Sequence, residues 1–162
     1  MEKKHDKSII RNYTEVDLPL YSYDRIFAMG NDTLIVELYD TFAGAYSDDA
    51  LQAVKGEYMD LVERDPGEHW YDSIKLAASI SKKGKKNQSS RFDEMTLQHF
   101  EAYLSDDATP VSDVTVKQEK ASYYVNGLLE KGGPSTDVFK KALGEEKTAK
   151  LFGDILFGTK IE

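Results

Sequence analysis

The pattern of hydrophobic and polar positions is strongest between Leu34 and Tyr46, the most apolar run of the chain. Asn31 or Asp32, just before it, could cap the first turn of a helix. The same stretch, read as TLIVELY, also fits a buried strand because Ile, Val and Tyr favour strands. We favour the helix because its period persists through three turns, and in either form the segment belongs in the core. The apolar positions are Leu34, Ile35, Leu38, Tyr39, Phe42, Ala43 and Tyr46.

Two weaker patterns precede this segment. Residues 1–8 are charged and are expected to form a loose tail. Within residues 9–21 apolar side chains alternate with polar ones, which is typical of an extended strand. Pro19 restricts that strand to a sheet edge or to a strap lying across helices. A short helix is expected over Tyr23–Met29, with Gly30 ending it.

Capping signals predict two helices after the central segment. The first begins at Ser47 with acidic residues in its first turn and continues to Val62. The second follows residues 65–68, DPGE, which place an Asp at the N-cap, a Pro at the first helical position and a Glu three residues after the cap. This helix is expected to extend to about Ser81. Residues 82–90 contain no apolar side chain and predict a flexible basic loop.

The C-terminal half is predicted to be helical throughout. Ser90 begins a helix that ends before a loop at residues 105–112, and a longer helix is expected over Val114–Glu130, although residues 111–116 could equally form a short strand. Gly132-Gly133-Pro134 ends the longer helix. Two short helices, Thr136–Leu143 and Glu145–Phe157, follow. The last of them is unusually apolar, so it either docks on the body or forms a contact between copies of the chain.

Together these patterns predict an all-α fold. It would contain about seven short helices in two packed halves, residues 9–81 and 91–162, with an extended N-terminal strap. At 162 residues with 40% apolar side chains, the chain is long enough for one domain with a proper core. Ten tyrosines accompany a single tryptophan, and tyrosine side chains can lie half in a core and half in water.

Composition narrows the function classes further. The chain has no cysteine, which excludes disulfides, thiolate metal sites and cysteine nucleophiles. No apolar run is long enough for a membrane helix, and the N-terminus does not resemble a signal peptide. We therefore expect a cytoplasmic protein with no membrane partner. The net charge of −8 argues against broad binding to nucleic acid.

The acidic residues are concentrated in one part of the sequence. Residues 31–72 hold eleven acids and two bases, so most of these acids cannot find an opposite charge within their own helices. Such a field can steer a basic partner, although solubility or neutralisation within the fold would explain it equally. The predicted partner-binding residues are Glu37, Asp40, Asp48, Asp49, Glu57, Asp60 and Glu63.

The basic residues are concentrated in the segment that follows. Residues 73–91 hold six bases and no acid. The cluster lacks the GxxxxGK[ST] spacing of a P-loop and has no interleaved aromatic residues for base stacking. It could contact the phosphates of nucleic acid or an acidic surface, or it could be a solvated loop. The alternative phosphate-binding residues are Lys82, Lys83, Lys85, Lys86 and Arg91.

The sequence shows no catalytic or metal-binding motif. His69 and Asp72 would share a helix face, but no HExxH or similar pair accompanies them. Adjacent carboxylates lie at expected helix starts or in loops, where capping and solvation explain them. GxSxG and GxGxxG are both missing. We therefore expect no catalytic residue, no bound metal and no cofactor.

The function predicted from these features is a non-catalytic protein-binding module that engages a basic partner through an acidic surface. One concrete form is an inhibitor, of the kind that phages and mobile elements encode, that mimics the charge of nucleic acid and blocks a nucleic-acid-binding enzyme. A first alternative is a nucleic-acid accessory protein that uses residues 82–91. A second is a small helical enzyme without a recognisable motif. A homo-oligomer could form through the C-terminal helix.

Overall fold

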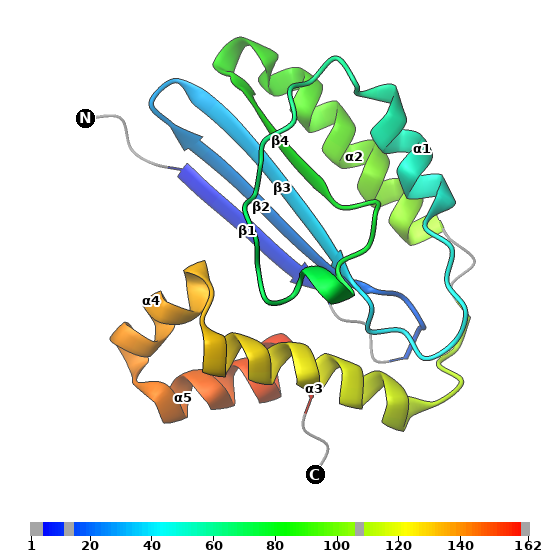
Figure 1. Ribbon diagram of the computed structural model, residues 1–162, viewed down its shortest axis with the longest axis vertical. Helices are drawn as coiled ribbons and strands as arrows, with labels where there is room; N and C mark the ends of the chain where they lie inside the picture. Colours follow the sequence, from blue (N-terminus) through cyan, green and yellow to red (C-terminus); the bar gives the residue numbers. More distant parts are fainter. Residues whose placement is uncertain (1–4, 12–14, 106–108, 160–162) are drawn as a thin grey trace.

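A four-stranded antiparallel sheet in the order β1-β2-β3-β4 lies at the centre of the computed structural model (Figure 1). The structure describes residues 5–11, 15–105 and 109–159, with side chains from residue 15 onward except at 134–135. The strands are β1 (His5–Arg11), β2 (Leu20–Ala28), β3 (Asn31–Tyr39) and β4 (Ile80–Lys85). The helices are α1 (Asp49–Glu57), α2 (Ser89–Ser105), α3 (Val114–Lys131), α4 (Pro134–Leu143) and α5 (Glu145–Lys150). Short turns form η1 (Asp72–Ile74) and η2 (Lys86–Gln88), and a π-helical segment forms η3 (Leu151–Leu156).

The all-α prediction is wrong, because the central segment forms β3 and not a helix. Asp32, Leu34, Val36 and Leu38 are fully buried, and the residues between them are partly exposed. A period of two is that of a strand, as in the alternative reading of this stretch. β3 also carries apolar residues on its second face, so its sequence is a nearly continuous apolar run. Such a run also matches the spacing expected for the buried face of a helix.

The helix predicted over Tyr23–Met29 is also wrong. Most of that range lies in β2, which pairs with β3 through a hairpin. The two-residue loop consists of Met29 and Gly30, with φ angles of 52° and 71°. Positive φ at both loop positions matches the twist that a tight hairpin requires, so Gly30 turns a hairpin and does not end a helix.

The segment between α1 and β4 contains no α-helix, contrary to the prediction from its DPGE motif. Asp65 Oδ1 accepts a hydrogen bond from the backbone N–H of Gly67 at 2.8 Å, and Gly67 has φ +77°. The carboxylate therefore stabilises a turn, because an Asp that can cap a helix can also bond its own backbone two residues on. In Figure 1 this segment crosses in front of the sheet before it reaches β4.

The basic loop predicted over residues 82–90 is likewise wrong. Residues 82–85 complete β4, residues 86–88 form η2, and Ser89 begins α2. The outer edge of β4 pairs with residues 62–64, since Arg64 N donates to Ser81 O at 2.9 Å and Lys83 N donates to Val62 O at 3.0 Å. This pairing holds the lysines in a strand.

The helices of the C-terminal half lie where they were predicted. The expected helix Val114–Glu130 corresponds to α3, and the Asp113 side chain caps it by accepting from Val116 N at 3.1 Å. The last predicted helix is divided between α5 and η3. Residues 5–8 of the predicted loose tail belong to β1, and residues 1–4 lie outside the described residues.

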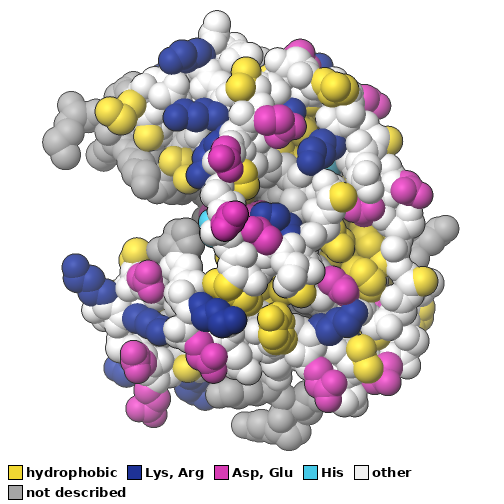
Figure 2. Space-filling view, in the orientation of Figure 1, with side chains coloured by type: hydrophobic (Ala, Val, Ile, Leu, Met, Phe, Trp, Pro, Cys, Tyr) yellow, Lys and Arg dark blue, Asp and Glu magenta, His cyan; other side chains and the backbone are white. Residues whose placement is uncertain are grey.

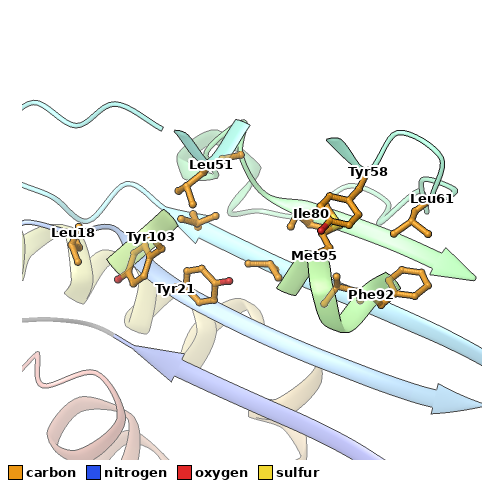
Figure 3. Close-up of a cluster of buried hydrophobic side chains, with 13 residues drawn as sticks. Leu18, Tyr21, Leu51, Tyr58, Leu61, Ile80, Phe92, Met95 and Tyr103 are labelled. Atoms are coloured by element: carbon orange, nitrogen blue, oxygen red, sulfur yellow. The ribbon is translucent and has the colours of Figure 1, made fainter. Parts of the chain in front are cut away.

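Two hydrophobic cores share the sheet. The first lies between the sheet and the pair α1 and α2, and it includes Tyr21 and Leu38 (Figure 3). The second lies between the end of the sheet, α3 and η3, and it includes Leu20 and Tyr39. Because successive strand residues point to opposite faces, neighbouring positions of β2 and β3 contribute to different cores. No helix within the described ranges is long and apolar enough to cross a membrane.

Candidate functional site

The sheet face opposite α1 and α2 is only partly covered, and we call it the outer face. The strand register places Ser22 opposite Glu37 and Asp24 opposite Ile35, so all four side chains share this face. Each of them is partly exposed. The outer face therefore offers two carboxylates, from Asp24 and Glu37, on adjacent strands.

Three tyrosines enclose one end of the outer face. Tyr39 is the last residue of β3, Tyr124 comes from α3, and Tyr71 comes from the segment that crosses the sheet. The Tyr39 ring lies 4.3 Å from the Tyr124 ring and 5.5 Å from the Tyr71 ring, measured between centroids. The Tyr39 hydroxyl donates to Glu37 Oε2 at 2.6 Å. Packing of the buried Tyr39 ring therefore fixes the position of its hydroxyl, and this hydroxyl holds the Glu37 carboxylate.

The tyrosine hydroxyls in this cluster stay protonated. Burial raises the pKa of Tyr71, and the negative charges of Glu37, Asp72 and Asp24 raise it further. Burial is also the main reason why the pKa of Tyr124 is raised. The phenols are therefore hydrogen-bond donors at any physiological pH, and they carry no charge of their own.

A histidine and a lysine complete the accessible side of the cluster. The His69 imidazole stacks on the Tyr71 ring at 4.8 Å with an interplanar angle of 8°, and its Nδ1 lies 3.9 Å from Asp72 Oδ1. Lys75 Nζ is 2.5 Å from Asp72 Oδ1 and 4.0 Å from Glu37 Oε1. The hydrogen bond from Lys75 is the largest cause that lowers the pKa of Asp72. Lys75 thus links the carboxylates of Asp72 and Glu37.

Trp70 fixes this arrangement by anchoring the crossing segment to α3. Its Nε1 donates to Gly132 O at 3.3 Å, and its ring lies directly against Gly127. A side chain at Gly127 would overlap the ring, so the glycine lets the segment approach the helix closely. Since Tyr71 and His69 flank Trp70, the anchor sets the position of both.

Figure 2 shows that the molecule is deeply notched between the part that carries the sheet and the part that carries α3, α4 and α5. The cluster can offer a ligand charge-assisted acceptors from carboxylates, phenol donors, an imidazole and aromatic surface. Within the described residues, no group of three or more His, Asp and Glu side chains could hold a metal ion.

The predicted acidic residues do not form one surface. Asp48 and Asp49 lie at the start of α1, and Glu37 lies on the outer face. Three others pair with bases that are distant in sequence: Asp40 with Lys120 at 2.7 Å, Asp60 with Arg91 at 3.3 Å, and Glu63 with Lys82 at 2.8 Å. Glu57 is exposed at the end of α1. Binding of a basic partner through these residues stays a prediction.

The predicted basic residues are separated by the alternation of β4. Lys82 is buried, and its Nζ donates to Tyr58 O and Leu61 O as well as pairing with Glu63. Lys83 and Lys85 point to the outer face and are exposed, as is Lys86 in η2. Arg91 in α2 pairs with Asp60 and Glu94 and covers the Tyr58 ring. Lys82 and Arg91 thus serve the fold, and only the other three are available to a ligand.

Sequence analysis missed most of this group of side chains, which we call the aromatic–carboxylate cluster. Its members are Asp24, Glu37, Tyr39, His69, Tyr71, Asp72, Lys75 and Tyr124. Asp24 and Tyr71 were assigned to helices that do not form, and His69 was placed on a helix face with Asp72, where no metal was expected. The one signal in the sequence was the excess of tyrosine, whose hydroxyls suit a half-buried site. Pairing of the strands brings these residues together, and no local spacing encodes it.

Comparisons with solved structures show a similarity in fold. No protein-family model and no curated protein matches the sequence. Among solved structures, the fold is similar to that of phytochromobilin synthase from tomato, determined in complex with biliverdin, with a TM-score of 0.65 and 16% sequence identity. The match covers 90% of this chain and 57% of that chain, so this chain spans little more than half the length of that protein. At this identity the likeness shows a shared α/β fold alone.

Proposed function

We propose that the aromatic–carboxylate cluster of the outer face binds a planar, conjugated small molecule with N–H donors, of the linear tetrapyrrole class. The observation that carries the proposal is Glu37. Its carboxylate is half-buried, is oriented by the Tyr39 hydroxyl, and shares the outer face with Asp24. Pyrrole N–H groups would donate to such a carboxylate, and charge-assisted bonds of this kind are the strong ones in a partly dry site.

The aromatic residues support the same class of ligand. The His69 ring stacks on Tyr71 close to the Asp72 carboxylate. Conjugated rings of a ligand would stack favourably on these aromatic side chains. The tomato enzyme, whose fold is similar, was crystallised with biliverdin, which is a linear tetrapyrrole. Biliverdin is therefore the probe molecule for the test below. The proposal concerns binding and includes no reaction.

The test is a titration of the purified protein with biliverdin, followed by the absorbance of the pigment. We expect a saturable spectral change at one ligand per chain. Substituting Glu37→Gln keeps the size of the side chain but removes its charge, so the dissociation constant should rise at least tenfold, which corresponds to about 1.4 kcal/mol. Thermal unfolding of the variant shows whether the fold is kept.

Glu57→Gln is the matched control, because Glu57 is an exposed carboxylate at the end of α1 and does not lie on the outer face. Its dissociation constant should stay within twofold of the original. The proposal is wrong if the wild-type protein gives no saturable change, or if Glu57→Gln weakens binding as much as Glu37→Gln does.

A further inference from the structure

A pocket of about 340 Å³ lies at the opposite end of the outer face, next to the β2–β3 hairpin. It opens to solvent between the end of β4, the start of β3 and the segment that pairs with the edge of β4. The strand register places Lys83 opposite Thr33, four residues before Glu37 along β3. At a rise of about 3.3 Å per residue, Lys83 is roughly 13 Å from Glu37 along the sheet. Arg64 lies nearer to the cluster, because it donates to Ser81 opposite Ile35 and its charge acts on Tyr71. Its lining consists of Asn31, Val62, Glu63, Arg64, Lys83, Gly84, Lys85 and Gln88.

The pocket is positively charged. Its one acid, Glu63, is paired with Lys82 at 2.8 Å, which neutralises the carboxylate. Arg64 donates from Nη1 to Ser81 Oγ at 3.3 Å, and Lys85 donates from Nζ to Asn31 Oδ1 at 3.2 Å, so both of these cations have neutral acceptors. Among the residues that the structure describes, no carboxylate lies within 4 Å of Arg64, Lys83 or Lys85. Arg64, Lys83 and Lys85 therefore line one pocket, and none of them forms an ion pair with a carboxylate of the described residues.

We propose that this pocket binds the phosphoryl group of a small phosphorylated molecule. A guanidinium and two ammonium groups match the charge and the acceptor oxygens of a phosphate, and the amides of Asn31 and Gln88 add neutral polar groups to the lining. The charge pattern around the pocket favours a small anion over a nucleic acid. Asp65 is exposed beside the segment that forms one wall, and the whole chain carries −8, so an extended polyanion would be repelled beyond the pocket.

The inference is independent of the tetrapyrrole proposal, because it uses other residues and another ligand chemistry. The probe is inorganic pyrophosphate, titrated by isothermal calorimetry into the full chain at moderate salt. We expect saturable binding at one site per chain. Lys83→Gln should weaken it at least fivefold, because Lys83 stands in the pocket and its ammonium group serves no ion pair within the described residues. Glu37→Gln should leave it unchanged.

Lys86→Gln is the matched control, since Lys86 is an exposed lysine close in sequence that does not line the pocket. It should change the dissociation constant less than twofold. A parallel titration with a single-stranded oligonucleotide distinguishes the sources of phosphate, and we expect it to bind more weakly than pyrophosphate. The inference is overturned if pyrophosphate does not saturate, if Lys86→Gln weakens binding as much as Lys83→Gln, or if the oligonucleotide binds more tightly.

Discussion

Several buried polar residues in the described part of the chain have specific hydrogen-bond partners, and His99 is the clearest case. Its Nδ1 lies 3.1 Å from the Tyr21 hydroxyl and its Nε2 lies 3.1 Å from Ala78 O. The carbonyl can only accept, so Nε2 carries the proton and Nδ1 accepts from the tyrosine. Burial lowers the pKa of His99 to about 4. The folded protein therefore holds a neutral imidazole, which links α2 to β2 and to the segment before β4.

This placement predicts that the protein loses stability in weakly acidic solution. The pKa of His99 is about 4 in the folded state and near 6.5 in the unfolded state, so between these pH values the unfolded chain binds more protons. The stability contributed by the neutral ring is complete above pH 6.5 and is lost as the pH falls to about 4, with a magnitude on the order of 3 kcal/mol. Urea unfolding at intervals from pH 7 to pH 4 measures the slope.

His99→Gln should flatten that slope, because glutamine does not titrate. His69→Gln, which removes an imidazole at the surface, is the matched control and should retain the wild-type slope. A parallel loss of stability in His99→Gln and in the wild type would contradict the prediction.

The same scale shows why sequence alone misassigned single residues. Asp32 was one of two residues expected to cap a helix, yet it is fully buried and pairs with Arg25, which has 2% of its side chain exposed. Lys82 and Lys83 are identical neighbours, but one fills the core and the other faces solvent. Successive residues of a strand point to opposite faces of the sheet, so the register of β4 decides which of the two lysines is buried. That register is fixed only when β4 pairs with β3.

At the scale of elements, local signals predicted the helices that rely on local contacts. α2, α3 and α4 each lie close to their predicted ranges, because amphipathic period and capping residues are encoded within a dozen neighbouring positions. The strands depend on partners far along the chain: β3 pairs with β4 across forty intervening residues. The DPGE motif could begin a helix or form a turn, and the central apolar run could form a helix or a strand. Packing within the sheet stabilises the turn and the strand. The outer face, and with it both proposed sites, could not be derived before the sheet was known.

The contact between Trp70 and α3 predicts opposite effects for two helical glycines. In Gly127→Ala the new methyl group would overlap the Trp70 ring, so overpacking should destabilise the protein by about 1–3 kcal/mol. In Gly56→Ala the methyl group meets nothing within 4 Å inside α1, and the substitution should stabilise the protein by about 0.5–1 kcal/mol. Chemical denaturation of both variants measures the difference.

Tryptophan fluorescence provides a second check on the same variants. Gly127→Ala should shift the Trp70 emission of the folded protein towards the red, because the ring loses its place against α3. Gly56→Ala should leave the spectrum unchanged. Equal stabilities of the two variants would contradict the packing argument.

At the scale of the whole molecule, β2 and β3 make the two cores dependent on each other. Tyr21 and Leu38 belong to the core beneath α1 and α2, and their neighbours Leu20 and Tyr39 belong to the core beneath α3. Neither core can lose its strands without the other losing them as well. The helices α1 and α2 on one side and α3 on the other therefore pack against the same two strands, β2 and β3.

This sharing predicts a single cooperative unfolding transition. The single tryptophan, Trp70, packs against the core beneath α3, so its fluorescence reports on that core. Far-UV circular dichroism reports on all the helices and strands. The two signals should give coincident urea transitions. An earlier transition in fluorescence would mean that the α3 core opens by itself.

Pairing of residues 62–64 along β4 has a consequence for how the sheet could meet other chains. The backbone groups of Ser81 and Lys83 on that edge already have partners, so an incoming strand cannot pair with them. In the described part of the chain β1 pairs with β2 alone, which leaves its outer side as the place where a further strand could be added. Within the described residues the sheet therefore has one open edge, and a strand donated by another chain could lie there parallel or antiparallel to β1.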